Sequence, residues 1–174
     1  MPGKRVKDWT IDTTVLYCAC AHMPEGKPKQ IANQVRKNDA KMSASSLLML
    51  ILDEEHRVAF DEDGQILGEY RRCLEKQRTP GSFITKWFVQ TLKLADYYVG
   101  DVPNDHDGAL KRLRFHRKDF VFVAVAAQTN TRRLVVEGDS DYTRAVKEYL
   151  KRKMDVRVLS CCDACQDAHP IRLP

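Results

Sequence analysis

Five short segments rich in aliphatic and aromatic residues alternate along the chain with segments of helical character, and this alternation constrains the fold most. Short strands separated by helices form parallel sheets, because each helix carries the chain back across a face of the sheet. The pattern therefore predicts an α/β fold with a mainly parallel central sheet flanked by helices. The predicted strands are residues 8–12, 57–60, 97–99, 134–137 and 156–159.

Helices are predicted where apolar residues recur at spacings of three and four. Ser43, Ser45 and Ser46 are candidate N-caps for an apolar helix at 45–55. Residues 120–127 stay open between strand and helix, because Phe and Val favour a strand and Ala a helix. The other expected elements are a helix or turn at 14–21, helices at 65–77, 82–94 and 142–153 (inward face Tyr142, Ala145, Val146, Tyr149 and Leu150), a turn at 61–64, a polar loop at 101–108 and, at 22–44, a polar loop leading into a charged helix.

Composition excludes several classes of protein. With 174 residues, 43% apolar and 30% charged, the chain has the size and balance of one folded domain and not of a disordered or fibrous protein. Its longest apolar runs, residues 47–52 and 120–127, are too short for a membrane-spanning helix. The first residues lack the apolar core of a signal peptide, so we expect a cytoplasmic protein without a membrane segment.

Positive charge gathers in three places, although the net charge is only +5. Residues 111–118 hold five fixed positive charges, and further groups lie at 27–41 and 144–153. Such groups can neutralise phosphates. The alternative for each one is a solvated helix face, but three together favour a polyanionic partner.

The cysteines near the end of the chain suggest a second kind of site. Cys162, Cys165 and His169 have the spacing of half a zinc site, whereas a structural zinc needs four ligands. The alternative is a loosely ordered tail, and the sequence leaves this question open.

Carboxylates occupy the positions that matter most in a parallel sheet. Asp12 ends one predicted strand, and Asp139 follows another by one glycine, with Asp141 two residues on. The carboxyl ends of parallel strands lie on one edge of the sheet, so these side chains face the same crevice. Glu69 borders the apolar stripe of its helix, and Asp119 precedes the apolar run at 120–127.

Each acid also has a purely structural explanation. Asp12, Asp119 and Asp139 could cap helices, and Glu69 could pair with Arg72. As a set, however, two carboxylates ~5 Å apart at an effective dielectric of ~20 repel by roughly 3 kcal/mol, which protonation or a cation relieves. Mg²⁺ and Mn²⁺ suit oxygen-only sites and can activate a water against a phosphodiester.

Four motifs in this order, residues 11–16, 66–71, 119–124 and 136–141, resemble those of the PIN-domain nucleases over residues 7–159. The resemblance implies a PIN-like three-layer fold at 1–159 with an insertion at 22–44, an acidic pocket at the strand ends, a helix beginning at Asp119, and a tail at 160–174. It implies Mg²⁺- or Mn²⁺-dependent cleavage of RNA, often single-stranded, in which Asp12, Glu69, Asp119 and Asp139 are the catalytic and metal-binding acids and Asp141 is an additional ligand.

The same resemblance assigns supporting roles. Thr13, Thr14 and Ser140 would orient the acids, although many PIN domains have Asn where Thr14 stands. The resemblance also implies a homodimer and, if the protein is a toxin or a defence effector, a protein inhibitor of the antitoxin kind. The basic side chains expected to hold RNA phosphates are Lys111, Arg112, Arg114 and Arg117.

Two other functions stay open at this stage. One is a PIN-like module that binds RNA or protein without cleaving. The other is a phosphatase that resembles the haloacid dehalogenases, a family that also begins with an Asp at a strand end. That family needs a second Asp two residues later, and Thr14 stands there instead.

Overall fold

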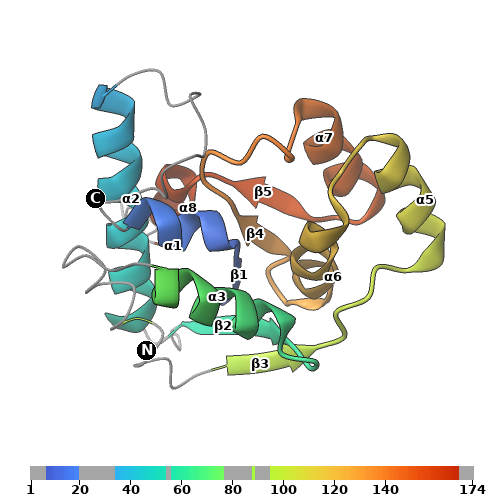
Figure 1. Cartoon of the computed structure of the whole chain (residues 1–174), viewed down its shortest axis with the longest axis horizontal. Helices are drawn as coiled ribbons and strands as arrows, with labels where there is room; N and C mark the ends of the chain where they lie inside the picture. The colour runs from blue at the N-terminus through green and yellow to red at the C-terminus, as the bar shows by residue number, and fades with distance from the viewer. Residues whose placement is uncertain (1–6, 20–33, 54–55, 77–87, 89–94, 169–174) are drawn as a thin grey trace, which may run out of the picture.

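The chain is described by a computed structural model that covers residues 7–19, 34–53, 56–76, 88 and 95–168 (Figure 1). Five parallel strands form one sheet in the order β3-β2-β1-β4-β5. Helices flank this sheet, so the predicted α/β fold is confirmed. The strands are β1 (Asp8–Ile11), β2 (Arg57–Asp61), β3 (Ala95–Tyr98), β4 (Arg133–Val135) and β5 (Arg157–Leu159).

The strand order reverses between β1 and β4. The chain moves from β1 outward to β2 and β3, and then returns to place β4 on the other side of β1. Ile11 of β1 pairs with Val135 of β4, so these two strands end at the same level. Ligands of open α/β sheets bind beyond the carboxyl ends of the strands at such a reversal.

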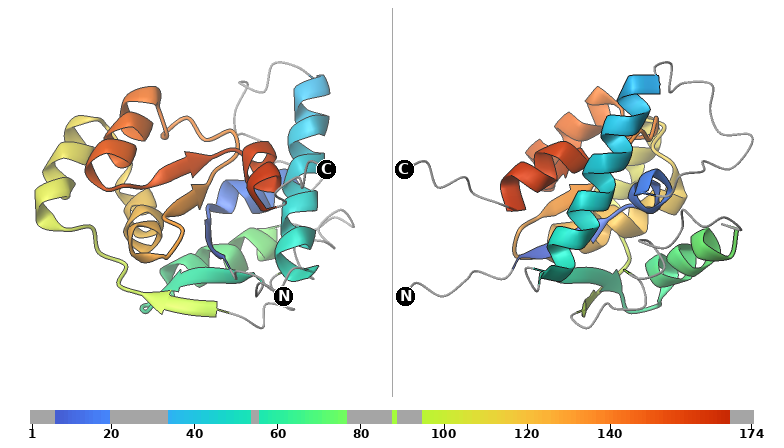
Figure 2. Two further views of the ribbon diagram at one scale, coloured as in Figure 1. Left: turned by 180° about the vertical axis from the view of Figure 1, so that it is seen from behind. Right: turned by 90° about the vertical axis from the view of Figure 1, so that its left-hand side faces the viewer.

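The helices form two groups around the sheet (Figures 1 and 2). One end of the molecule holds α1, α2, α3 and α8, where α2 packs against both α1 and α8, and the other end holds α5 and α7. The helices are α1 (Thr13–Ala19), α2 (Gln34–Asp53), α3 (Gln65–Lys76), α5 (Asn104–Arg112), α6 (Phe120–Gln128), α7 (Arg144–Lys153) and α8 (Cys161–Ala168).

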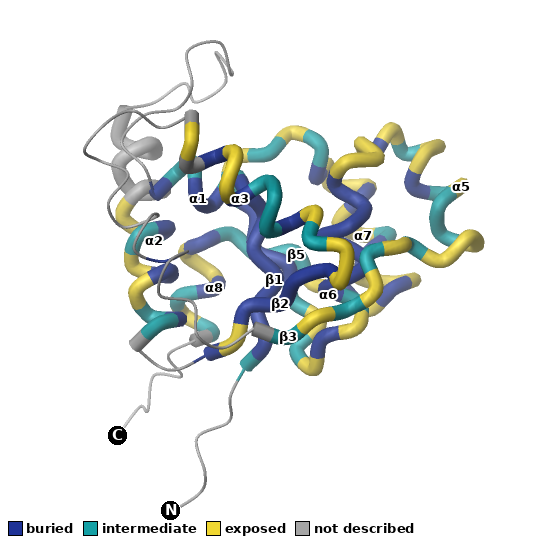
Figure 3. Tube along the Cα trace, turned by 60° about the horizontal axis from the view of Figure 1, so that its bottom comes forward, coloured by how far each residue is buried: buried dark blue, intermediate teal, exposed yellow. Residues whose placement is uncertain are grey.

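The segment at 120–127 is helical, as the PIN resemblance implied and local propensity left open. Every residue of α6 from Phe120 to Ala126 is buried, and the helix contacts β1, β2 and β4 (Figure 3). A helix that is apolar all round is stable when it is enclosed. Tertiary packing therefore decides the conformation of this segment.

Helix α2 differs from the sequence prediction. The polar segment leading into a charged helix and the apolar helix at 45–55 are parts of one element, α2, so the predicted N-caps at Ser43, Ser45 and Ser46 are wrong. Ser45 Oγ instead donates to the Ala19 carbonyl, 3.5 Å away, which is compatible with a position inside a helix. Residues 22–33 of the expected insertion lie outside the described residues, as does nearly all of the predicted helix at 82–94.

The predicted polar loop at 101–108 is wrong from Asn104 onward, because α5 begins there. Pro103 is its N-cap residue, acidic residues occupy its first turn and basic residues its last turn. This arrangement complements the helix dipole, and it outweighs the poor helix propensity of Gly108.

The C-terminal segment also differs from prediction. Residues 161–168 form α8 instead of a loosely ordered tail, and Cys161 and Ala164 are buried in the core shared with α2. The domain therefore extends beyond residue 159. In α7, Val146 and Leu150 face inward as predicted, but Ala145 is exposed. Among the described helices, none combines the length and apolar character needed to cross a membrane.

Candidate metal centre

Asp12 lies directly after β1 and caps the first turn of α1. Its backbone N–H donates to the Val135 carbonyl at 2.9 Å, which ties the residue to the end of β4. Its Oδ1 accepts hydrogen bonds from the N–H and the hydroxyl of Thr14, both at 2.8 Å. Asp12 is buried, so this carboxylate is held rigidly at the strand reversal.

Asp119 closes a short 3-10 helix, η2 (Arg117–Asp119), and directly precedes α6. It stands in the N-cap position, yet its side chain makes no capping hydrogen bond. Its Oδ2 is buried and has no hydrogen-bond partner among the described residues. A buried acceptor without a hydrogen-bond partner destabilises the fold, so we expect this oxygen to bind a cation or a proton.

Asp139 approaches from the loop after β4. Gly138 adopts a left-handed conformation (φ 68°), which turns the chain at this point, and Asp139 Oδ1 accepts from the Asp141 N–H at 2.8 Å. The structure brings Asp12, Asp119 and Asp139 together: one carboxylate oxygen from each lies within 4.8 Å of the other two. Three elements distant in sequence thus converge on one point.

The electrostatics of this cluster favour a proton or a cation. Burial raises the pKa of Asp12 from 3.8 to about 6, against hydrogen bonds from Thr14 that lower it. Burial, reinforced by the charge of Asp12, raises the pKa of Asp119 from 3.8 to about 8. The nearby charge of Lys118 opposes the second shift without cancelling it. The pKa of each group rises chiefly because a charged carboxylate loses its hydration when it is buried, and the neighbouring carboxylates add to the shift.

Glu69 and Asp141 lie near the cluster but outside the group of three. Glu69 Oε2 accepts from the Thr13 hydroxyl at 3.0 Å, and its charge contributes to the raised pKa of Asp12. The next residue, Tyr70, is buried and donates to the Ile11 carbonyl at 2.5 Å, which fixes α3 against the end of β1. The backbone N–H of Asp141 donates to the Asp139 carboxylate, and the charge of Asp141 helps to raise the pKa of Asp119.

Tyr142 is a member of this site that sequence reasoning treated only as core. Its hydroxyl lies 3.5 Å from Asp12 Oδ2, and its ring packs edge-on against Phe115, which stacks on Phe120. Burial and the adjacent carboxylates raise the pKa of Tyr142, so the hydroxyl stays protonated and can donate. The sequence feature that could have identified Tyr142 as part of the site is its position directly after Asp141.

Thr14 links Asp12 to a second network. Its hydroxyl donates to Asp12 and accepts from the Glu137 N–H at 3.2 Å. Glu137 in turn accepts from the Cys161 N–H at 3.0 Å through its carboxylate. Thr14 therefore holds Asp12 through two donated hydrogen bonds and ties it to Glu137 through an accepted one. Through Glu137, α8 supports the segment that leads to Asp139.

The basic side chains singled out from the sequence lie around α5 and η2. Lys111 pairs with Asp107 at 2.6 Å, within the same helix. Arg112, Arg114 and Arg117 are exposed, as is Ser140 in the loop before α7. Lys118, whose charge acts on Asp119, was part of the same basic run but had been given no role in the site.

The described cysteines do not form a metal site. Cys162 is exposed, and Cys165 Sγ lies 3.5 Å from the Ser43 carbonyl. Within the described residues, the side chains placed to share a metal ion are those of Asp12, Asp119 and Asp139, and no cysteine is among them. His169 lies outside the described residues.

Comparison of the chain with protein-family models, with curated proteins and with solved structures finds no match. The geometry of the site is therefore the basis for assigning a function.

Proposed function

We propose that this chain is a Mg²⁺- or Mn²⁺-dependent endoribonuclease of the PIN-domain type that cleaves single-stranded RNA. The observation that carries this proposal is the convergence of Asp12, Asp119 and Asp139 within 4.8 Å at the strand reversal. That these acids line an open pocket stays a prediction.

The residues present fit a divalent cation. All three candidate ligands are carboxylates, and oxygen-only donor sets suit Mg²⁺ and Mn²⁺. Asp119 Oδ2, which has no hydrogen-bond partner within the described part of the chain, is an available ligand atom. Asp12 Oδ2 is another, since its contact with the Tyr142 hydroxyl is long, at 3.5 Å. When bound, such an ion lowers the pKa of a water and neutralises charge on a phosphoryl oxygen.

The chain's own residues keep this site in order. The two Thr14 contacts orient Asp12, and the Tyr142 hydroxyl supports its other oxygen. The ring of Phe115 packs against Tyr142 and stacks in turn on Phe120. Glu69 stands beside Thr13, where it can hold a water or add a ligand. Preorganisation of this kind is what hydrolysis of a phosphodiester requires of a protein.

Single-stranded RNA suits the surroundings of the acids. Exposed cations at Arg114, Arg117 and Lys118 border Asp119 in sequence, and positive side chains near the site can hold backbone phosphates. A cytoplasmic location, expected from the sequence, would give the protein access to such substrates.

The direct test is cleavage of a mixed single-stranded RNA pool with Mg²⁺ or Mn²⁺ by wild type, Asp12→Asn and Asp139→Asn. Asn retains an acceptor oxygen, so Asp12→Asn keeps the cap on Thr14 while removing the charge. We expect metal-dependent cleavage by wild type and its loss in both variants, with unchanged circular dichroism. Full activity in either variant would refute the assignment. Mn²⁺ binding without cleavage of any RNA would favour a non-cleaving module.

A further inference from the structure

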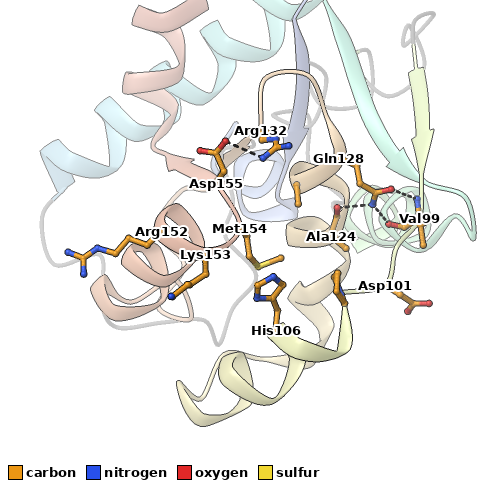
Figure 4. Close-up of a pocket in the computed structure, with 12 residues that line it drawn as sticks. Val99, Asp101, His106, Ala124, Gln128, Arg132, Arg152, Lys153, Met154 and Asp155 are labelled. Atoms are coloured by element: carbon orange, nitrogen blue, oxygen red, sulfur yellow. Dashed lines mark hydrogen bonds and ion pairs between the residues drawn. The ribbon is translucent and has the colours of Figure 1, made fainter.

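A cavity of about 500 Å³ lies between α5, α6 and the end of α7 (Figure 4), and none of the three clustered aspartates lines it. Ala124 and Ala127 of α6 form one wall, and Met154, at the end of α7, lies next to His106 of α5. This volume lies within the range of roughly 300–1,000 Å³ typical of ligand sites, and the mixture of apolar atoms and one ring is typical as well.

The imidazole of His106 is held in place at this cavity. Its Nδ1 lies 2.9 Å from the Tyr149 hydroxyl, and the two rings pack edge to face with centroids 6.0 Å apart. Its side chain keeps 21% of its surface exposed. A fixed, partly exposed ring beside a thioether is a surface on which a nucleobase can stack.

Unpaired positive charge extends from the cavity along α7. Lys147, Lys151, Arg152 and Lys153 are exposed, and within the described part of the chain none of them forms an ion pair. Arg152 and Lys153 line the α7 side of the cavity, and their side chains extend outward from it (Figure 4). The helix dipole explains cations in the last turn, but it does not explain Lys147 in the middle of the helix.

Helix α7 connects this surface to the aspartates. Thr143 caps α7 through the Val146 N–H, and it follows Asp141 by two residues. A helix of 10 residues spans about 15 Å, so the cations run from the region of Asp139 toward the cavity. A flexible polyanion that enters the aspartate site can therefore also reach the cavity, which a small anion cannot do.

We propose that the exposed face of α7 and the adjoining cavity bind a stretch of single-stranded RNA away from the point of cleavage. The phosphates lie along Lys147, Lys151, Arg152 and Lys153, and one base lies in the cavity against His106 and Met154. The choice of RNA as the polyanion rests on the proposed function. The location of the binding surface rests on the charge and shape of α7 and the cavity.

The test measures binding of a fluorescein-labelled oligouridylate by fluorescence anisotropy over a range of salt concentrations. EDTA is present, so that metal-dependent cleavage cannot occur. Wild type is compared with Arg152→Gln/Lys153→Gln and with Ala127→Glu, which fills the cavity and adds a negative charge. Arg57→Gln/Arg72→Gln is the control, since it removes the same charge from exposed positions on β2 and α3.

We expect Arg152→Gln/Lys153→Gln to lower the slope of log K against log salt by about 1.4, because each lost phosphate contact contributes about 0.7 for single strands. Ala127→Glu should weaken binding about fivefold or more, the effect of losing one stacked base. The control should keep the wild-type slope. Thermal unfolding of each variant confirms that it is folded at the assay temperature.

The proposal would be overturned if Arg152→Gln/Lys153→Gln kept the wild-type salt slope and Ala127→Glu kept the wild-type affinity for the oligouridylate. Binding of poly-glutamate in place of RNA, with the same dependence on α7, would also overturn it in favour of an acidic protein partner. Metal-dependent cleavage by wild type together with unaltered RNA binding by the variants would leave the proposed nuclease standing and remove only this surface. RNA binding that depends on α7, without metal-dependent cleavage by wild type, would support this surface and contradict the proposed nuclease.

Discussion

Two neighbouring strands end in a buried aspartate, and the two aspartates do different things. Asp61 at the end of β2 uses both carboxylate oxygens to cap α3, accepting from the N–H groups of Gln65 and Ile66 at 2.7 Å each. Asp12 at the end of β1 uses Oδ1 for α1 and leaves Oδ2 with a long contact to Tyr142. A helix cap thus satisfies one carboxylate fully and the other only in part.

The surroundings enlarge this difference. A Cβ atom at Gly100 would lie 3.2 Å from both the Asp61 Cβ and a Val121 methyl, so the backbone at Gly100 packs closely against Asp61. Asp12 instead faces two further carboxylates, Asp119 and Asp139. The comparison indicates that a strand-end acid becomes a candidate metal ligand when other acids converge on it and its acceptor oxygens are left over.

The largest effect should separate Asp119→Asn from Asp61→Asn in RNA cleavage. Loss of a metal-ligating charge should lower kcat by roughly a thousandfold, equivalent to about 4 kcal/mol of transition-state stabilisation. Asp61→Asn should keep activity within a few-fold at temperatures where it is folded. Equal losses in both variants would mean that the two regions do not differ in function.

The pH dependence of stability should reveal the buried carboxylates of the cluster. Burial raises the pKa of Asp12 to about 6 and of Asp119 to about 8, both from 3.8, so the folded protein holds these protons more tightly than the unfolded chain. Their stabilising contribution is complete below about pH 4 and is lost as the pH rises through 6 and 8. For Asp12 the loss is on the order of 3 kcal/mol, at about 1.4 kcal/mol per unit of pKa shift.

Thermal unfolding in EDTA from pH 5 to 8.5 measures this loss. The melting temperature of wild type should fall relative to that of Asp119→Asn as the pH rises, and Mn²⁺ should reverse the fall because the cation replaces the protons. Parallel curves for the two proteins would show that Asp119 does not titrate in this range.

Removing the cap at β2 should cost stability and little else. Asp61→Ala leaves the N–H groups of Gln65 and Ile66 without their acceptor, which we expect to lower the free energy of unfolding by about 2 kcal/mol. Urea denaturation measures the loss, and Mn²⁺ titration of the folded variant should give the wild-type affinity. Weakened Mn²⁺ binding would show that the two strand ends are coupled.

The smallest effect should come from Thr14→Val, which keeps the shape of the side chain. The variant loses the hydroxyl contacts to Asp12 and to the Glu137 N–H. Groups that orient a ligand typically change metal affinity 10–100-fold, and because the Thr14 N–H still holds Asp12 we expect about tenfold weaker Mn²⁺ binding. Isothermal titration calorimetry measures the change, with Thr10→Val, a buried hydroxyl inside β1, as the matched control.

The fold and part of the cluster could be predicted from sequence for a physical reason. Parallel strands place all their carboxyl ends on one edge, so the pattern alone located Asp12 and Asp139 together. The inclusion of Asp119 depended on the PIN resemblance, because local propensity left the helix that follows it undecided.

Other features depended on contacts that no local pattern contains. Asp12 and Asp61 both end strands, and only tertiary contacts distinguish the shared site from the closed cap. The Tyr142 hydroxyl reaches Asp12 across 130 residues of sequence, and α8 forms because its apolar residues are buried against α2. Helix α5 could have been found, since its acidic first turn and basic last turn are visible in the sequence.

Mn²⁺ binding to the metal-free protein, followed by electron paramagnetic resonance, tests most directly whether the end of β1 differs from the end of β2. Wild type, Asp12→Asn, Asp139→Asn and Asp61→Asn are titrated under the same conditions. We expect saturable binding by wild type and Asp61→Asn with similar dissociation constants, and binding weakened by about tenfold or more in the other two variants. Absence of Mn²⁺ binding by wild type, or unchanged affinity in Asp12→Asn and Asp139→Asn, would contradict the assignment of a metal centre.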